Sequence, residues 1–341
     1  MKLASFVIDG RDTFGFQAAP GRVVEWAAAA AAFGLDWRDG PRDMHDFIEA
    51  EPARRQGWRE LHDRVVAEPG RVPSHDADAL HWRAPVRRPS KICCLALNNS
   101  ANVDRILSGP KHPAIFIKPS SALIGHGEAI ELRAAYGRVH PEPELALVIG
   151  RRAKNVAAAD ALDYVFGYTI HNDLTAPTMR GEDTFHYRAI HPKSGDATAI
   201  EYVDSHVSYP GRYKCSDTFA ALGPWLVTRD EIADPHALDV SCLHQGSLVT
   251  HDNTVNLFHK VPQVIEFISH YMTLLPGDVV SMGTALQRSP GGRAVQNVDL
   301  TTLGGPVAVT IQGLGTLSAG VVDTPPASPG DQLGRLACDS F

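Results

Sequence analysis

The stretch that decides the fold runs from Glu142 to Asp173 and reads EPELALVIGRRAKNVAAADALDYVFGYTIHND. Its apolar segments ELALVIG and YVFGYTI predict two buried strands. Residues two apart in a strand point to the same face, so Glu142 and Glu144 share a face. Pro143 between them suits the start or the edge of a strand. The two like charges need a cation between them, or one must stay protonated.

A third carboxylate, Asp173, closes the second predicted strand. Three acidic side chains without soft ligands suit a hard cation such as Mg²⁺, Mn²⁺ or Ca²⁺. From these residues alone, a solvated strand start followed by an ordinary turn aspartate remains an alternative.

Outward from this stretch, short apolar runs bounded by Pro, Gly, Asn or Asp predict further strands. They are KICCLALNN, AIFIKP, GPWLVT and DVVSMGT. Two helical patterns interrupt them, AAADALDYVFGY and TVNLFHKVPQVIEFISHYM, and we expect Pro262 to break the second. Many strands with few helices predict an α+β, mostly β, fold rather than alternating βαβ units.

The chain divides by composition into three parts. Residues 1–88 predict a small N-terminal region with a strand-like start, an alanine-rich helix and a charged helical stretch, and RAPVRRPS is interpreted as a linker. Residues 89–323 form the predicted catalytic domain. Residues 324–341, rich in Pro and Ser, predict a flexible tail.

Composition excludes several classes of function. The formal net charge of −7 leaves no basic surface for nucleic acid. Five cysteines without a CxxC pair favour a reduced, cytoplasmic setting. No run approaches the ~20 apolar residues of a membrane span, so we expect no membrane partner.

Five ordered motifs resemble the fumarylacetoacetate hydrolase family. They are FIKPSSALIGHGEAIEL, then E-x-E-L-A-x-V-I-G, G-Y-x-x-x-N-D, YKCSDTFAALGPWLVT and LLPGDVVSMGT, and they span roughly Lys91 to Val322. The resemblance implies a mixed β-roll, a homodimer, and a divalent metal held by Glu142, Glu144 and Asp173. It also implies a small-molecule substrate, either a 2-oxo acid or a related 1,3-dicarbonyl.

The resemblance also assigns roles outside the metal site. Lys214 maps onto the family's active-site lysine, and Gly283 with Thr284 onto the turn that binds the substrate carboxylate. Hydrolytic members carry a His/Glu dyad that activates water, but those positions are Asn102 and Arg105 here. Asn cannot act as a base, so we place Asn102 with the substrate-binding residues. The family's arginine after the metal Asp is Pro177, and a family glutamine is replaced, with Thr250 in that strand.

An unusually long segment separates Asp173 from Lys214 and contains His186 and His191. We interpret it as a lid whose histidines supply the missing base, and His140 beside Glu142 is a further candidate. The alternative is that these are surface histidines. The chain has 16 histidines, which weakens the case for any one of them.

These features predict a metal-dependent enzyme that cleaves the C–C bond of an acylpyruvate through a metal-stabilised enolate. Decarboxylation, tautomerisation or dehydration of a 2-oxo acid needs less from a water-activating base. A family member that binds a metal and a small acid without turnover is the remaining alternative.

Overall fold

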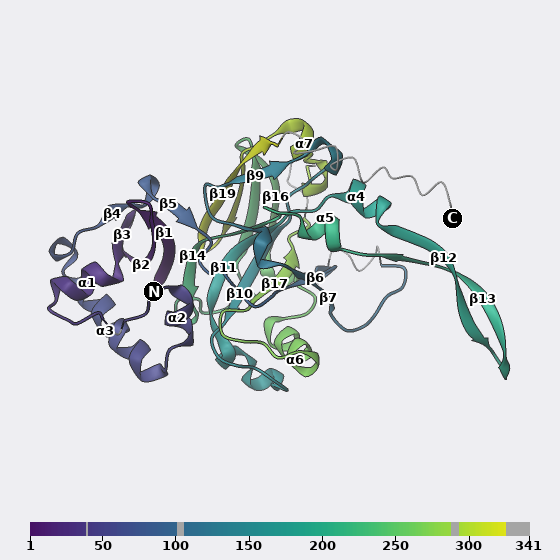
Figure 1. Cartoon of the computed structure of the whole chain (residues 1–341), viewed down its shortest axis with the longest axis horizontal. Coiled ribbons are helices and arrows are strands. Elements are labelled where there is room, and N and C mark those ends of the chain that lie inside the picture. Colours follow the sequence, from purple (N-terminus) through teal and green to yellow (C-terminus); the bar gives the residue numbers. More distant parts are fainter. Residues whose placement is uncertain (39, 101–105, 288–292, 325–341) are drawn as a thin grey trace.

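The computed structural model describes residues 1–38, 40–100, 106–287 and 293–324. The fold is α+β and mostly β, as the sequence predicts. Figure 1 shows an N-terminal region beside a central β body, with a long hairpin projecting from the opposite side.

The largest sheet of the described residues has twelve strands. Ten of them follow the order β4-β3-β2-β1-β14-β11-β10-β17-β6-β7, while β5 pairs with β1 and β8 pairs with β14. The strands are β1 (Lys2–Ile8), β2 (Arg11–Ala19), β3 (Arg22–Glu25), β4 (His75–Asp76), β5 (His81–Arg83), β6 (Ile92–Ala96), β7 (Ala114–Lys118), β8 (Leu123–Ile124), β10 (Pro143–Ile149), β11 (Val165–Asp173), β14 (Ala220–Thr228) and β17 (Val279–Thr284).

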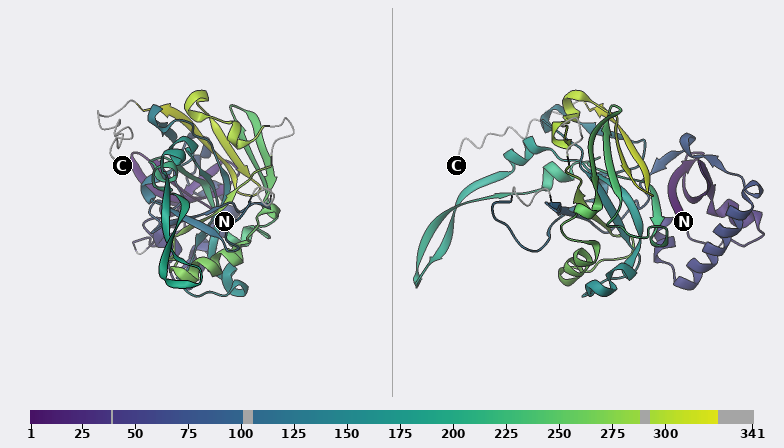
Figure 2. Two further views of the ribbon diagram at one scale, coloured as in Figure 1. Left: turned by 90° about the vertical axis from the view of Figure 1, so that its right-hand side faces the viewer. Right: turned by 180° about the vertical axis from the view of Figure 1, so that it is seen from behind.

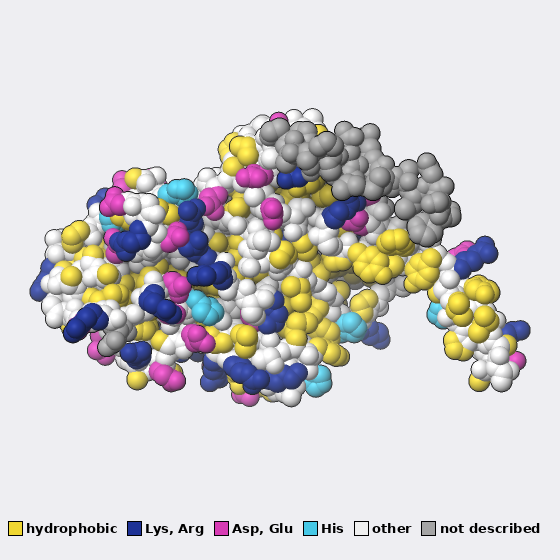
Figure 3. All heavy atoms as spheres, in the orientation of Figure 1, with side chains coloured by type: hydrophobic (Ala, Val, Ile, Leu, Met, Phe, Trp, Pro, Cys, Tyr) yellow, Lys and Arg dark blue, Asp and Glu magenta, His cyan; other side chains and the backbone are white. Residues whose placement is uncertain are grey.

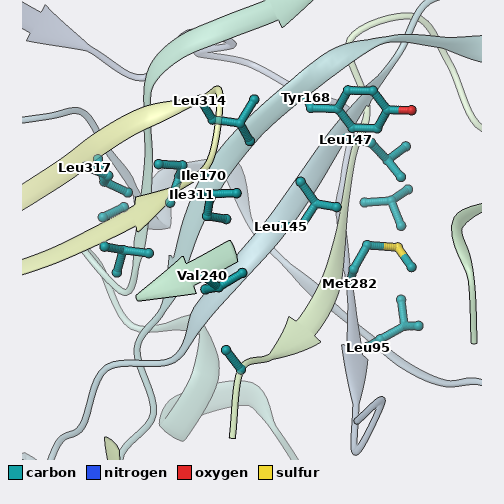
Figure 4. Packing of buried hydrophobic residues seen from close by; sticks show 14 of the residues in the cluster. Leu95, Leu145, Leu147, Tyr168, Ile170, Val240, Met282, Ile311, Leu314 and Leu317 are labelled. Atoms are coloured by element: carbon teal, nitrogen blue, oxygen red, sulfur yellow. The ribbon is translucent and has the colours of Figure 1, made fainter. Parts of the chain in front are cut away.

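A second sheet of five strands packs on the main sheet in the order β16-β15-β18-β19-β9. Its strands are β9 (Ala129–Leu132), β15 (Asp239–His244), β16 (Ser247–Asn253), β18 (Val307–Ile311) and β19 (Gly315–Asp323). Figure 4 shows Leu145 and Ile170 of the main sheet with Val240 and Ile311 of the second, in one buried cluster. The third sheet is the projecting hairpin of β12 (Thr184–Lys193) and β13 (Asp196–Ser208).

Strand β10 is buried on both faces, which explains its unbroken apolar sequence. Leu145 and Leu147 belong to the core shared with the second sheet. Ala146 and Val148 face a separate core that contains Trp26 of the N-terminal region. The two cores fix the register of β10, because a slip by one residue would exchange its two faces.

The N-terminal region shares the main sheet, since β1 pairs with β14. The predicted linker is packed against the body: Ala84 and Val86 are buried, and Ser5 donates a hydrogen bond to the carbonyl of Pro85 at 2.9 Å. The predicted alanine-rich helix is α1 (Trp26–Ala32). The charged stretch predicted as one helical segment is divided between the end of α2 (Met44–Glu49) and α3 (Pro52–Ala67), which begins at a proline.

Two helix predictions need correction. The segment AAADALDYVFGY forms only a short 3₁₀ helix, Ala158–Tyr164, because β11 begins at Val165 and takes its β-branched and aromatic residues. Pro262 does not break the second helix, because α6 (Val261–Tyr271) begins beside it. Proline is tolerated in the first turn of a helix, where the backbone N–H that it lacks would have no partner within the helix. Three short helices complete the described set, namely α4 (Pro177–Glu182), α5 (Gly211–Cys215) and α7 (Leu300–Leu303). No described helix is long and apolar enough to cross a membrane.

The N-terminal region is tied to the β body by an ion pair. Arg59 of α3 donates to both carboxylate oxygens of Asp230, at 2.7 and 3.1 Å. Both residues line a cavity of about 530 Å³ between the two parts, together with Arg55, Arg151 and Phe166.

We expect Asp230→Asn to lower the free energy of unfolding by about 0.2–1 kcal/mol at pH 7, because the pair is partly exposed. The hydrogen bond from Arg59 holds the pKa of Asp230 well below its usual value. The stabilisation is therefore present above pH ~4 and is lost as the pH falls through the lowered pKa. Urea unfolding should show a difference from the wild type at pH 7 that narrows at pH 3. Glu60→Gln, on the same helix, is the control and should show no such pH-dependent difference.

Candidate active site

The three predicted metal ligands meet where β10 begins and β11 ends. One carboxylate oxygen from each of Glu142, Glu144 and Asp173 lies within 4.8 Å of the other two. Antiparallel pairing of β10 with β11 brings them together, since Glu144 lies opposite His171 and the Asp173 N–H donates to the Glu142 carbonyl at 2.9 Å. Pro143 is the first residue of β10, which is one of the two places that its missing N–H allows.

Lys214 lies at the centre of this cluster rather than on the surface. Its ammonium donates to Glu142 Oε2 and to Asp173 Oδ2, both at 2.6 Å. Burial alone would lower the pKa of Lys214, but the charges of Asp173, Glu142 and Glu144 outweigh it and raise the pKa above its usual value. Lys214 is therefore charged.

Sequence reasoning missed a second buried lysine, Lys118 at the end of β7. It is fully buried, and its ammonium contacts Asp173 Oδ1. Burial would raise the pKa of Asp173, but the charges of Lys118 and Lys214 outweigh it and lower the pKa. The sequence feature that could have revealed it is the lysine in the apolar run AIFIKP. That run contains no acidic residue to pair with a buried ammonium, so the partner had to come from elsewhere in the chain.

Glu144 is held by the strand beside it. It accepts hydrogen bonds from the Ser281 hydroxyl, the Gly283 N–H at 3.1 Å and the Thr284 hydroxyl at 3.0 Å. Gly283 has φ +95°, and a side chain there would also press on Asn98. The predicted turn thus lies at the site, but its N–H and hydroxyl bind Glu144 here rather than standing free for a substrate carboxylate.

The donor set fits a hard divalent cation. Three carboxylates and two ammonium groups leave one excess negative charge, and every ligand atom is a carboxylate oxygen, as Mg²⁺ and Mn²⁺ prefer. The ligands are also oriented before a cation binds, because Glu144 and Asp173 are buried and hydrogen-bonded.

The cluster opens into a cavity of about 450 Å³. Its walls are Leu95, Ala96, Leu97, Asn98, Phe116, His140, Glu142, Thr175, Pro177, Arg180, Tyr213, Lys214, Thr284, Leu286 and Gln296. A small organic acid fits a volume of this size.

Two wall residues add chemistry that the motifs did not assign. His140 is buried, and its Nε2 lies 3.9 Å from Glu142 Oε1. Arg180 of α4 is exposed to the cavity, and no carboxylate of the described residues lies within ion-pair distance of it. Arg180 stands about one helical turn beyond Pro177, the position at which the resemblance places the family's arginine.

His186 and His191 do not lie at the site. Both stand exposed on β12, and neither lines the cavity. The segment is not a lid, because its residues form a ladder of their own with β13 and extend away from the body. Asn102 and Arg105 lie outside the described residues.

The fold is a mixed β-roll that carries, at the mouth of a small cavity, a cluster of three acidic side chains able to hold a divalent cation. The family model for the fumarylacetoacetate (FAA) hydrolase C-terminal domain matches residues 91–322, and the chain belongs to this family.

Among curated relatives, the mitochondrial oxaloacetate tautomerase Fahd2a of Rattus norvegicus is 35% identical over 202 residues, which are 59% of this chain and 57% of that protein. Protein Rv2993c of Mycobacterium tuberculosis is 36% identical over 234 residues, covering 68% of this chain and 76% of that protein.

Two solved structures extend the similarity. The maleylpyruvate hydrolase of Sphingobium sp. SYK-6, in complex with manganese(II) and pyruvate, is 27% identical with a TM-score of 0.67. The 5-carboxymethyl-2-hydroxymuconate delta-isomerase of Mycobacterium smegmatis is 26% identical with a TM-score of 0.62. Each alignment covers 95% of this chain and 100% of the other.

We expect Glu144→Ala to abolish binding of Mg²⁺ or Mn²⁺ while leaving the chain folded, because it removes one ligand of three. Titration calorimetry measures the binding and circular dichroism checks the fold. Calorimetry that shows wild-type affinity in this variant would contradict the site. Glu131→Ala, an exposed acid of β9, is the matched control and should bind as the wild type does.

We expect Lys118→Met to destabilise the protein by about 3–5 kcal/mol, because it removes a partner of a fully buried carboxylate. Chemical unfolding in the absence of metal measures the loss. Saturating Mg²⁺ should restore part of it by supplying positive charge to Asp173. A variant as stable as the wild type would contradict the role given to Lys118.

Proposed function

We propose that this protein is a divalent-metal-dependent enzyme that moves a proton at the carbon beside the ketone of a 2-oxo acid, a keto–enol tautomerase. The observation that carries the proposal is one cavity whose wall includes Glu142 of the three-carboxylate cage, the buried Lys214 and the buried His140. The similarity to oxaloacetate tautomerases, and to a structure that holds manganese and pyruvate, supports it.

Glu142, Glu144 and Asp173 would hold the cation, which when bound supplies Lewis-acid stabilisation of negative charge on the oxo-acid oxygens. Lys214 is charged and lies at the cavity wall. Its ammonium can donate a hydrogen bond to an enolate oxygen as charge develops there. Lys118 keeps Asp173 ionised and in place, so it acts on the ligand and not on the substrate.

His140 is the group that takes the proton. Its Nδ1 lies 3.2 Å from the carbonyl of Pro141, and a carbonyl only accepts, so Nδ1 carries the ring proton. Nε2 is then left with a lone pair, which suits a general base. Arg180, which also lines the cavity, supplies a cation for a substrate carboxylate.

Hydrolysis of the C–C bond of an acylpyruvate is the second candidate. It is favoured by the similarity to maleylpyruvate hydrolase over 95% of the chain. Hydrolysis requires an activated water as well as a stabilised enolate, and in this cavity His140 is the side chain placed to activate it. The two reactions therefore share the cage and Lys214 and differ in what His140 deprotonates.

We expect Lys214→Ala to lower kcat/KM for oxaloacetate tautomerisation by about 10²–10³-fold, as loss of an oxyanion donor does. His140→Gln should lower it by about 10²–10⁴-fold through loss of the base. Asn102→Ala should cost far less than Lys214→Ala. Enol absorbance with Mg²⁺ or Mn²⁺ measures the rates.

His251→Gln changes an exposed histidine of β16 and is the control for the histidine variant. Acylpyruvate cleavage by the same panel separates the two candidates. An inactive wild type on both substrates would sink the proposal, as would an undiminished rate in His140→Gln.

A further inference from the structure

The hairpin of β12 and β13, residues 184–208, is here called the arm. Figures 1 and 2 show it extending well beyond the body of the protein. Among the described strands, β12 and β13 pair with each other and with no third strand, from Thr184 opposite Ser208 to Lys193 opposite Asp196. A two-stranded hairpin alone in water is marginally stable at best, so a long arm of this kind needs a surface to pack on.

The arm carries large apolar side chains on both faces. Residues directly opposite each other share a face, so Phe185 and Val207 lie on one face, while Ile190 and Tyr202 lie on the other. Ile190 and Tyr202 are each 64% exposed and Phe185 is 63% exposed. Figure 3 shows hydrophobic atoms along the arm and at its base. Such an exposed apolar surface marks an interaction site.

The charge of the arm argues against a nucleic acid or an anionic membrane as its partner. Its two basic residues are outnumbered by three acidic ones, and Arg188 is already paired with Asp204 at 3.2 Å. The surface is close to neutral and apolar, which suits a protein surface.

The body of the same chain offers a matching surface. Strand β7 ends the order of the main sheet, so one of its edges is unpaired among the described strands, and its Ile117 is 47% exposed. Leu97 and Phe258 near the cavity are also exposed. An open edge with apolar side chains needs cover. A second copy of the chain has both an arm and a β7 edge. In a two-fold dimer each arm packs on the partner's β7 edge, so the same contact forms twice.

The area is sufficient for a stable dimer. Aromatic side chains bury roughly 150–250 Å² each, so the exposed apolar side chains of one arm supply several hundred Å². These side chains are Phe185, Tyr187, Ile190, Ile200, Tyr202 and Val203. A standard interface buries ~1,200–2,000 Å² in total. Two arms, together with the surface that each covers on the partner, supply an area of this order.

The arm is also connected to the cavity through the two helices that flank it. Arg212 of α5 donates to Asp183 at 2.7 Å and to Glu182 at 3.0 Å, and so ties the two ends of the arm together. Helix α4 before the arm carries Arg180, and helix α5 after it carries Lys214. The Cys215 thiol donates to the Ile117 carbonyl, which links α5 to the β7 edge.

We propose that each arm packs on the β7 side of a second copy of this chain, and that this contact fixes α4 and α5 around the cavity. The active site is then fully formed only in the dimer. The dimer contact does not rest on the proposed reaction. The link to catalysis does, and the two are measured separately below.

The test is the double variant Ile190→Asp/Tyr202→Asp, which places two charges on one face of the arm. The matched control, Leu35→Asp/Val66→Asp, makes the same kind of change at exposed apolar positions of the N-terminal region. Light scattering should give twice the chain mass of 36.9 kDa for the wild type and the control, and 36.9 kDa for the arm variant. A second variant, with residues 187–205 replaced by Asn-Gly, should also be a monomer.

A monomeric wild type, or an arm variant that keeps the wild-type mass, would overturn the dimer contact. So would a control that dissociates as the arm variant does. For the link to the cavity, we expect the monomer to bind Mg²⁺ as the wild type does but to show a KM raised at least tenfold. A monomer with wild-type KM and kcat would overturn that link while leaving the contact standing.

Discussion

The site depends on the repulsion among three carboxylates that the strand pairing forces together. Glu144 and Asp173 are buried, and their neighbour Glu142 is within ligand distance of both. Buried charges of one sign are unstable unless they are paired. Two buried lysines provide the pairing: Lys118 from the end of β7 and Lys214 from α5. A cage that still holds an excess negative charge after this pairing retains an affinity for a divalent cation.

The rest of the fold keeps the carboxylates from moving apart. Strand β10 packs on two hydrophobic cores, one on each face. One core is shared with the second sheet and the other with the N-terminal region. The N-terminal region therefore contributes to the site through packing behind it, without reaching the cavity. Because protein interiors transmit strain rather than absorb it, a change in the second core would shift β10 and with it Glu144.

The sequence predicted the features that follow from local pattern. The strands of the main body and the same-face glutamates came from periodicity, and the place of Lys214 in the site came from the family resemblance. Lys118 was missed because a lysine at the end of a short apolar run resembles an ordinary strand end, and only the three-dimensional pairing shows its partner. Arg180 was missed because it lies three residues beyond Pro177, the position that the motif marks, and only the fold shows that it lines the cavity.

The error at His186 and His191 has a different physical origin. A segment rich in His, Pro and charged residues was interpreted as a lid, but its alternation of apolar and polar residues was the pattern of two paired strands. A single chain cannot show why such strands stay exposed, since that depends on what covers them. The cage and the two lysines lie on β10, β11, β7 and α5, whereas the hairpin between Asp173 and Lys214 forms a separate sheet among the described strands. Helices α4 and α5 flank the hairpin and supply Arg180 and Lys214 to the cavity wall. A contact that covers the hairpin would therefore act on these two cavity residues, while the strands that carry the three carboxylates stay in place.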